Sequence, residues 1–244
     1  MKILAVSDET SNTLESMVVR SSEKLKDINL ILACGDLDRD YMEFLVDGLD
    51  KEFFFVSGNH VQEEDDETYL GFEIIDRLWD TIKTSAEKII KCIAGQEDLH
   101  GRVSVFRDYL IAGFGGSRWY NGRGNQFKES EMARVVNKVI TKIRFFRMHD
   151  KLLGLKRKEI IVISHAPPSG VHDQSDLPHT GFKCFHKLIK KMSPLLWLHG
   201  HVHLQNARQS QITMAGNTTV VNCCGYKFIK VERKKIQVSN KYDI

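Results

Sequence analysis

The sequence lacks any apolar segment that approaches the roughly 20 residues a membrane-spanning helix needs, so we expect no membrane partner. None of its five cysteines forms a Cys-x-x-Cys pair, and their odd number differs from the pattern of a small disulfide-rich secreted domain. We therefore expect reduced, mostly buried thiols in a cytoplasmic protein. The sequence also lacks internal repeats and low-complexity segments.

A large excess of charge of either sign is missing too. The formal net charge of +3 is too small to imply a nucleic-acid or membrane partner by itself. Hydrophobic residues make up 42% and charged residues 27% of the chain, as in ordinary soluble globular proteins. We expect one domain over residues 1–244 and favour it over two small ones. The segment from Met1 to Asp8 soon meets a carboxylate, which predicts a strand and not a signal peptide.

Short, continuously apolar segments alternate with segments of helical periodicity. Such strands indicate a sheet covered on both faces, which is the α/β pattern. We predict strands at residues 2–7, 28–33, 53–56, 160–163 and 194–198, and helices at 13–25, 41–49, 129–153 and 181–192. Residues 102–106 and 109–114 predict a hairpin, and the short strands within residues 212–238 suggest a second, more antiparallel sheet.

Two charged segments have alternative interpretations. The acidic residues 63–67 and the amphipathic residues 69–92 predict a solvated loop followed by one or two helices, within a helical insertion at about 63–95. The predicted helix at 129–153 carries basic residues, among them Lys138, Lys142, Arg144, Arg147 and Lys151, beside an apolar stripe. We favour a solvated basic face there, and the alternative is an electropositive rim that gathers anionic substrate.

The segment Leu198-His199-Gly200-His201-Val202-His203 places three imidazoles within five positions. In an extended segment, residues two apart point the same way, so His201 and His203 could face one object. Gly200 allows a tight turn and the close approach of a ligand. Converging imidazoles are typical of a metal site, although short His-x-His segments also occur on ordinary surfaces.

A metal-binding type of residue follows each of five predicted strands. These residues are Asp8, Asp36, Asn59 with His60, His165, and His201 with His203. Because the carboxyl ends of strands line the ligand crevice of α/β sheets, groups far apart in sequence can meet there. Any one of the three non-histidine residues could instead cap the helix after its strand. Their joint occurrence favours a metal site.

The donor types narrow the choice of metal. Carboxylate, amide oxygen and imidazole without thiolate suit Mn, Fe, Zn or Co. Six candidate ligands exceed what one tetrahedral ion takes, so we expect two ions about 3.5–4 Å apart, as in phosphatases and nucleases. Such a pair neutralises an anionic phosphoester and ionises water near neutral pH.

The chain resembles the calcineurin-like metallophosphoesterases over nearly its whole length. The matching motifs are Gly35-Asp36, Gly58-Asn59-His60, Ser164-His165-Ala166-Pro167 and Gly200-His201-Val202-His203. More narrowly, Leu177 to Phe182 and Gly115-Gly116-Ser117 look like a small bacterial and archaeal branch of phosphoesterases. The resemblance implies an α/β four-layer sandwich, in which α-helices flank two facing mixed β-sheets.

The same resemblance implies a role for each site residue. Asp36 would bridge two divalent metal ions, with manganese favoured in vitro. Asp8 and His203 would hold one ion, while Asn59, His165 and His201 would hold the other. A metal-bridging hydroxide would attack the phosphorus, and His60 would protonate the leaving oxygen as general acid.

Two positions depart from the family pattern. The first motif is usually Asp-x-His, but Thr10 stands at the histidine position, so the first site is weaker, completed by water, or filled by Glu9 or Thr10 itself. Arg39 occupies the position of the carboxylate that usually orients His60, and Asp38 or Asp40 could substitute. Loss of such support typically costs 10–100-fold in affinity or activity.

We therefore expect a metal-dependent phosphoric ester hydrolase acting on a small phosphoester or a nucleotide. The sequence does not choose between monoesters and diesters. Arg118, with Trp119 and Tyr120, could bind a phosphate and a base, or belong to a packed loop. The alternatives are a non-catalytic metal-binding scaffold of the same fold and a nuclease acting on single-stranded nucleic acid, which is possible but not favoured. The sequence makes no prediction of oligomeric state.

Overall fold

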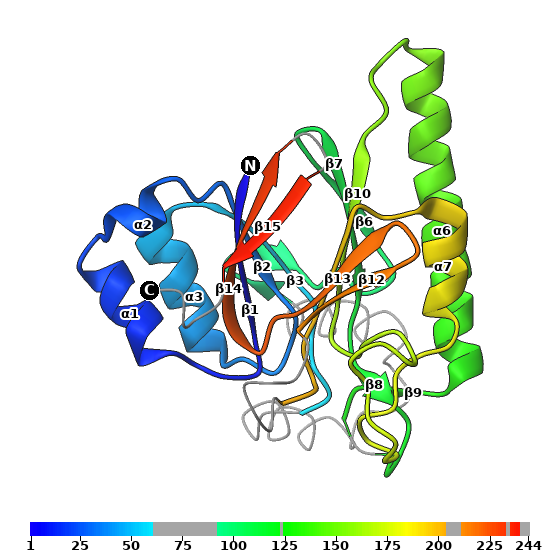
Figure 1. Cartoon of the computed structure of the whole chain (residues 1–244), viewed down its shortest axis with the longest axis horizontal. Coiled ribbons are helices and arrows are strands. Elements are labelled where there is room, and N and C mark those ends of the chain that lie inside the picture. Colours follow the sequence, from blue (N-terminus) through cyan, green and yellow to red (C-terminus); the bar gives the residue numbers. More distant parts are fainter. Residues whose placement is uncertain (61–91, 123, 204–210, 233–234, 240–244) are drawn as a thin grey trace, which may run out of the picture.

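Two β-sheets pack face to face, and helices cover the outer face of each (Figure 1). The computed structural model describes residues 1–60, 92–122, 124–203, 211–232 and 235–239. The four-layer α/β sandwich expected from the sequence is confirmed.

The first sheet contains the three N-terminal strands and two from the end of the chain. Its order is β15-β14-β1-β2-β3. The strands are β1 (Lys2–Ser7), β2 (Leu30–Ala33), β3 (Glu52–Phe55), β14 (Gly225–Glu232) and β15 (Lys235–Ser239). Strands β1, β2 and β3 run parallel, whereas β14 pairs antiparallel with both β1 and β15.

The second sheet has the order β12-β13-β11-β10-β7-β6. Its strands are β6 (Val103–Phe106), β7 (Tyr109–Phe114), β10 (Glu159–Ser164), β11 (Leu196–His199), β12 (Ile212–Ala215) and β13 (Thr218–Asn222). Strands β7, β10, β11 and β13 are parallel, and β6 and β7 form the predicted hairpin. Short pairs β4 (Cys92–Ile93) with β5 (Gln96–Glu97), and β8 (Ser117–Arg118) with β9 (Gln126–Phe127), lie outside the two sheets.

The prediction that the C-terminal strands form a sheet of their own is wrong. Strands β14 and β15 extend the first sheet, while β12 and β13 extend the second. Strand β14 fits beside β1 because it is apolar on both faces. Its Ile229 and Val231 pack between the sheets, and its Tyr226 packs beneath the helices.

Helices α1 (Asn12–Val19), α2 (Glu23–Lys26) and α3 (Arg39–Leu49) cover the first sheet, and α6 (Glu129–Leu152) and α7 (Phe185–Met192) cover the second. The single helix predicted at 13–25 is two helices, because the backbone at Ser21 is left-handed, with φ 49°. Helix α7 begins later than predicted, since Phe182 forms a bridge with Pro168. The predicted acidic loop at 63–67 and most of the predicted helices at 69–92 lie outside the described residues.

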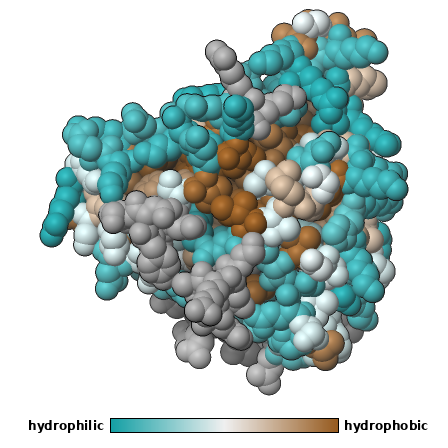
Figure 2. All heavy atoms as spheres, viewed as in Figure 1, coloured by the Kyte–Doolittle hydropathy of each residue, from teal (hydrophilic) through white to brown (hydrophobic). Residues whose placement is uncertain are grey.

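Alternation along the strands sorts the apolar side chains into layers. On β1, Ile3 and Ala5 face the second sheet, whereas Leu4 and Val6 face the helices. Fully burying one such aliphatic side chain contributes roughly 1.5–3 kcal/mol. The surface in Figure 2 is hydrophilic over the helices at both sides and has an apolar area in its middle. Ile212 and Met214 on the edge strand β12 are exposed apolar side chains. No helix in the described part of the chain has the length and apolar character to cross a membrane.

The carboxyl ends of the parallel strands meet at one edge of the sandwich. After β1, the Asp8 N–H donates to Gly35 O at 3.1 Å. After β10, His165 O accepts from the Gly200 N–H at 3.0 Å, and His199 O accepts from the Cys223 N–H at 2.7 Å. These backbone bonds hold the strand ends together within each sheet, and the contact of His165 Nδ1 with Cys34 O at 2.9 Å joins the ends of β10 and β2 across the two sheets.

Candidate metal centre

Three of the predicted site residues have left-handed backbone conformations. Asp8, Asp36 and His201 have φ angles of 64°, 53° and 68°. This region is uncommon for residues other than glycine and costs roughly 1–2 kcal/mol per residue. Each lies in the turn that leaves a strand, where the strained backbone directs a polar side chain across the edge of the sheets.

The glycines beside these residues allow close approach. A Cβ on Gly58 would lie 1.8 Å from Asp36 Oδ1, and a Cβ on Gly200 would lie 2.5 Å from Asp8 Oδ2. Any side chain at either position would therefore displace a carboxylate of the site. At Gly200 the group in close approach is the Asp8 carboxylate of the protein itself.

Asp36, His165 and His201 bring one donor atom each within 4.8 Å of one another. His165 Nε2 lies 3.1 Å from Asp36 Oδ2 and 2.8 Å from Asn59 Oδ1. The His165 and His201 rings have centroids 4.7 Å apart. The first centre, as we call Asp36, Asn59, His165 and His201, thus combines carboxylate, amide and imidazole donors from the ends of β2, β3, β10 and β11.

The hydrogen bonds of His165 determine which sign of charge the first centre stabilises. Its Nδ1 donates to Cys34 O at 2.9 Å, so Nε2 faces the Asn59 and Asp36 oxygens, which are both acceptors. Burial disfavours the charged ring, but the Asp36 and Asp8 carboxylates outweigh burial and raise the pKa of His165 to about 9. Burial likewise opposes ionisation of Asp36, and the His165 charge and hydrogen bonds lower its pKa to about 2. The group therefore favours a positive charge at its centre.

His201 is held as a neutral ring. Its Nε2 lies 2.7 Å from Pro178 O and must donate, which leaves Nδ1 as the lone-pair atom. Burial and the nearby His165 lower the pKa of His201 to about 3. A ring nitrogen fixed by a carbonyl in this way is the usual support of a metal-binding imidazole.

Asp8 presents a buried oxygen that lacks a partner. Its Oδ1 accepts from the His201 N–H at 2.8 Å, while Oδ2 has no hydrogen-bond partner among the described residues. Burial raises the pKa of Asp8. A buried carboxylate oxygen without a partner is costly and would be compensated by a cation. The unpaired oxygen and the donor set of the first centre both fit a divalent metal ion.

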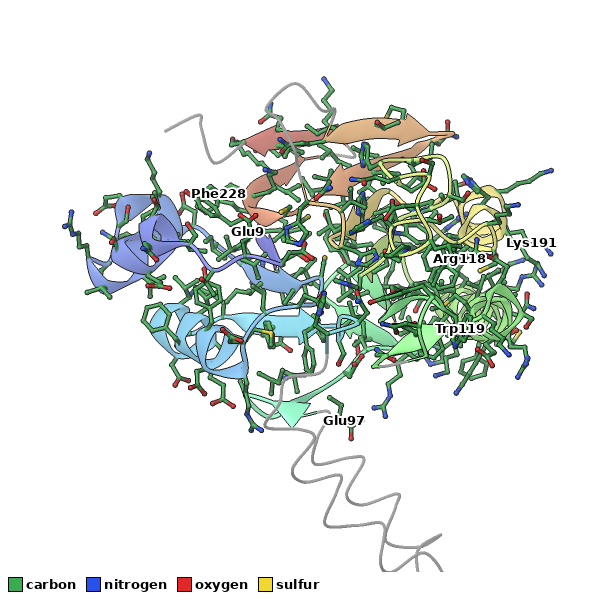
Figure 3. The ribbon with its side chains drawn as sticks, turned by 90° about the horizontal axis from the view of Figure 1, so that it is seen from below. Glu9, Glu97, Arg118, Trp119, Lys191 and Phe228 are labelled. Carbon is green, nitrogen blue, oxygen red and sulfur yellow. The ribbon has the colours of Figure 1, made fainter. Side chains whose placement is uncertain are left out.

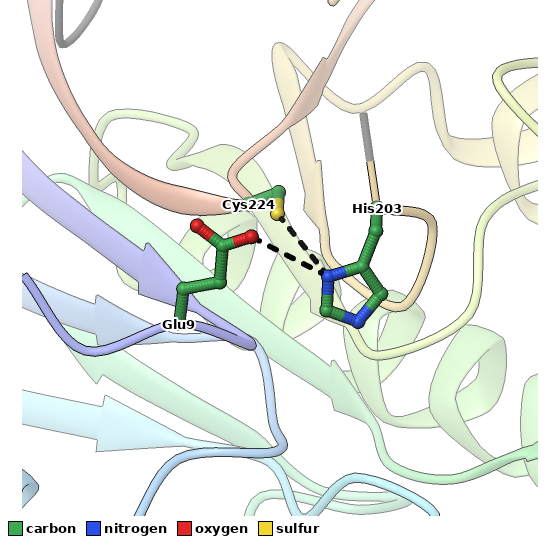
Figure 4. Close-up of side chains that lie close together, drawn as sticks. All are labelled: Glu9, His203 and Cys224. Atoms are coloured by element: carbon green, nitrogen blue, oxygen red, sulfur yellow. Dashed lines mark hydrogen bonds and ion pairs between the residues drawn. The ribbon is translucent and has the colours of Figure 1, made fainter. Parts of the chain in front are cut away.

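His203 belongs to a different group of donors from His201. Glu9, His203 and Cys224, which we call the cysteine cluster, also lie with one donor atom each within 4.8 Å of one another (Figure 4). The expectation that His201 and His203 lie on one extended segment is wrong, because β11 ends at His199 and His201 is left-handed.

Cys224 is the metal-binding type of residue that sequence reasoning missed. It follows β13, whose carboxyl end lies beside that of β11. The rule that located the other donors at strand ends applies to it equally. The expectation of a site without thiolate therefore does not describe the cysteine cluster.

His60 follows Asn59 and extends from the first centre into solvent. Its N–H donates to Asp36 Oδ1 at 3.0 Å, and its Nε2 lies 3.8 Å from Asp36 Oδ2. The side chain is 76% exposed. Arg39, at the position of the missing carboxylate, turns toward Glu43 on α3 at 2.9 Å. Within the described part of the chain, the carboxylate that the His60 ring faces is that of Asp36.

Arg118 and its neighbours divide between two environments. Arg118 lies 3.8 Å from Glu129 at the start of α6, whereas Tyr120 Oη accepts from Asn59 Nδ2 at 3.3 Å. Seen from below in Figure 3, Arg118 and Trp119 lie on the α6 and α7 side, apart from Glu9. Tyr120 is thus the member of this loop in contact with the first centre.

Further side chains hold the turns in place. Asp98 is buried and accepts from the Ser57 N–H, the Ser57 hydroxyl and the His100 N–H, at 3.0, 2.5 and 2.7 Å. This fixes the turn after β3, and no sequence signal pointed to it. His199 Nε2 is hydrogen-bonded to His172 Nδ1 at 2.9 Å, and His199 belongs neither to the first centre nor to the cysteine cluster. Burial lowers the pKa of His199 to about 3 and keeps it neutral.

Comparisons with known proteins agree with this fold. A family model described as calcineurin-like phosphoesterase matches residues 1–205. The structure of TT1561 of Thermus thermophilus aligns with a TM-score of 0.59 and 16% identity over 98% of each chain. GAP50, described as the anchor in the inner membrane complex of Plasmodium, aligns with a TM-score of 0.53 and 11% identity over 98% of this chain and 83% of its own. No curated protein sequence matches the chain.

Proposed function

The chain belongs to the calcineurin-like phosphoesterase family, and we propose that it is a phosphoesterase that uses two divalent metal ions. The observation that carries the proposal is the first centre. It gathers donors of Asp36, His165 and His201 within 4.8 Å at the strand ends, beside the unpaired buried oxygen of Asp8. This arrangement stabilises positive charge, which is what binding an anionic ester and its activating ions requires.

We propose a division of the site residues between two ions. Asn59, His165 and His201 would hold one ion, Asp8 and His203 the other, and Asp36 both. Such ions, when bound, neutralise phosphate charge and lower the pKa of water to near neutrality. The protein contributes the orientation of its ligands, through the bonds from His165 to Cys34 O and from His201 to Pro178 O.

His60 is proposed as the general acid. Its backbone is tied to Asp36, while its ring extends toward solvent, where a leaving group would depart. A proton on the ring would pass to the leaving oxygen as the ester bond breaks. Arg118 is proposed as a phosphate contact, a role in which it would exchange the Glu129 carboxylate for substrate. The substrate class is a small phosphoester or nucleotide.

We propose one metallophosphoesterase domain over residues 1–244, with a helical insertion at about 63–95 that ends in the strand β4. The family match to residues 1–205 supports the larger part of it, and β14 completes the first sheet beyond that limit.

The alternative function is a metal-binding scaffold without catalysis. GAP50 has a related fold and is described as an anchor, so the fold alone does not decide between the two. The position of His60 beside Asp36 favours the enzyme, because a scaffold has no use for a general acid. A further alternative is a nuclease, whose binding to single-stranded nucleic acid would depend strongly on salt concentration.

A substrate panel with metals tests the proposal. Metal-free protein would be loaded with Mn²⁺, Co²⁺ or Zn²⁺ and assayed on chromogenic monoesters and diesters, cyclic nucleotides, dinucleotides and single-stranded nucleic acid. We expect hydrolysis that a chelator abolishes. His165→Ala should lower both metal content and turnover, by more than the roughly 100-fold that losing a supporting partner costs. His186→Ala, on the exposed face of α7, is the matched control and should behave as wild type. A folded, metal-loaded protein inert on the whole panel would support the scaffold.

A further inference from the structure

The cysteine cluster joins three loops that follow three different strands. Glu9 follows β1 of the first sheet, while His203 and Cys224 follow β11 and β13 of the second. Figure 4 shows the three side chains pointing toward one another, with the carboxylate and the thiol on the same side of the His203 ring, where both face its Nδ1. Loops from both sheets thus bring a carboxylate, an imidazole and a thiol together.

The donors are spaced nearly as they would be around one shared ion. His203 Nδ1 lies 3.5 Å from Glu9 Oε1 and 3.9 Å from Cys224 Sγ. Donors around a tetrahedral zinc ion stand about 3.3–3.6 Å apart, given its bond lengths to oxygen, nitrogen and sulfur. Only small rotations of the half-exposed Glu9 and His203 side chains would bring all three donors to one ion.

The cysteine cluster offers donors in place of the imidazole that the first sequence motif lacks. Thr10 stands where the family pattern has an imidazole, and its side chain is exposed. The adjacent Glu9 carboxylate and the Cys224 thiol lie beside His203 instead. Cys224 is 8% exposed, so its sulfur lines the cluster from the protein side, while the other two donors face solvent.

We propose that Glu9, His203 and Cys224 are ligands of a thiophilic divalent cation, Zn²⁺ or Co²⁺. The inference deepens the proposed function and rests on it, because it identifies ligands of the second ion. A thiolate selects Zn²⁺ and Co²⁺ over Mn²⁺ and Mg²⁺, whereas the oxygen and nitrogen donors of the first centre accept Mn²⁺. Binding of the ion releases the Cys224 thiol proton to solvent. The protein therefore holds two ions of different chemical preference.

Cobalt spectroscopy of the whole chain tests the inference without an activity assay. Metal-free protein would be titrated with Co²⁺ while the near-ultraviolet thiolate-to-cobalt absorption is recorded. We expect the band in wild type and its loss in Cys224→Ser. Glu9→Gln should keep the band but weaken Co²⁺ binding, by at least the roughly 10–100-fold that losing a supporting partner of a ligand costs. Circular dichroism of each variant would establish folding.

Two cysteine variants serve as controls. Cys184→Ser changes a cysteine just before α7, whose N–H donates to Glu129. Cys223→Ala removes the thiol next to Cys224 in sequence, which lies in the core between the sheets. Both should keep the band. A wild-type protein without the band, a band that survives in Cys224→Ser, or a band lost with Cys223 would overturn the inference. An activity assay of the same wild-type sample distinguishes the two proposals. Chelator-sensitive hydrolysis without the absorption band would contradict the cysteine cluster as a metal site and support the proposed function. The band without hydrolysis would support the metal site and contradict the proposed function.

Discussion

At the scale of single residues, His165 is the side chain on which the first centre depends. With Nδ1 donating to Cys34 O, its Nε2 faces the Asn59 and Asp36 oxygens, at 2.8 and 3.1 Å. A proton or a metal ion between these atoms turns repulsion among acceptors into attraction. The pKa of about 9 for His165 expresses this preference, and a metal ion that binds at neutral pH must displace that proton.

That several candidate donors lie close together could be predicted from the sequence, for a physical reason. Parallel strands end at one edge, so polar residues at strand ends meet, and Asp36, His165 and His201 do. The orientation of side chains could not be predicted. His201 and His203 separate because a left-handed residue interrupts the extended segment. Cys224 was missed because the cysteines were expected to be buried thiols of the core.

His60 gives the residue-scale prediction. Substituting His60→Gln should leave metal content unchanged and lower kcat by about 10²–10⁴-fold, because the leaving oxygen loses its proton donor. Metal analysis and steady-state kinetics on the best substrate of the panel would measure both effects. The control is His186→Gln on α7. Metal loss in the His60 variant would instead identify this side chain as a ligand.

At the scale of elements, the helices and strands could be predicted more closely than their ends. The β6–β7 hairpin and the long helix α6 agree with the apolar periodicity. The break at Ser21 could not be predicted, because the apolar spacing continues across it. The partners of β14 could not be predicted either, since an apolar strand fits either sheet and its choice depends on non-local pairing with β1.

The end of α6 is tied to β10 by a buried ion pair. The Asp150 carboxylate is 4% exposed and accepts from Lys158 Nζ at 2.9 and 3.0 Å. The hydrogen bond from Lys158 lowers the pKa of Asp150 below its ordinary value of 3.8. The folded state then binds the proton more weakly than the unfolded state does. The stabilisation is therefore complete above pH 3.8 and is lost as the pH falls through the lowered pKa.

This linkage gives the element-scale prediction. Asp150→Asn should lower the free energy of unfolding at pH 7, and the difference from wild type should shrink as the pH falls below about 4. Urea unfolding across this range would measure it, with the exposed Asp47→Asn on α3 as control. A difference that stays constant with pH would show that packing, and not the ion pair, accounts for the effect.

At the scale of the whole molecule, the two sheets contribute different types of donor atom at their common edge. The first sheet contributes Asp8, Glu9, Asp36 and Asn59, which offer oxygen donors. The second contributes His165, His201, His203 and Cys224, which offer nitrogen and sulfur. The apolar core between the sheets holds these two sets in register. A metal centre assembled in this way requires both sheets to be folded and packed.

A crystal structure of the protein grown with Mn²⁺ and Zn²⁺, with anomalous scattering recorded on both sides of each metal absorption edge, tests this account most directly. We predict two metal positions at the shared edge. One should be contacted by Asn59, His165 and His201 and contain manganese, the other should be contacted by Asp8, Glu9, His203 and Cys224 and contain zinc, and Asp36 should contact both. An edge without anomalous density, or metal ions bound only elsewhere on the molecule, would contradict the account.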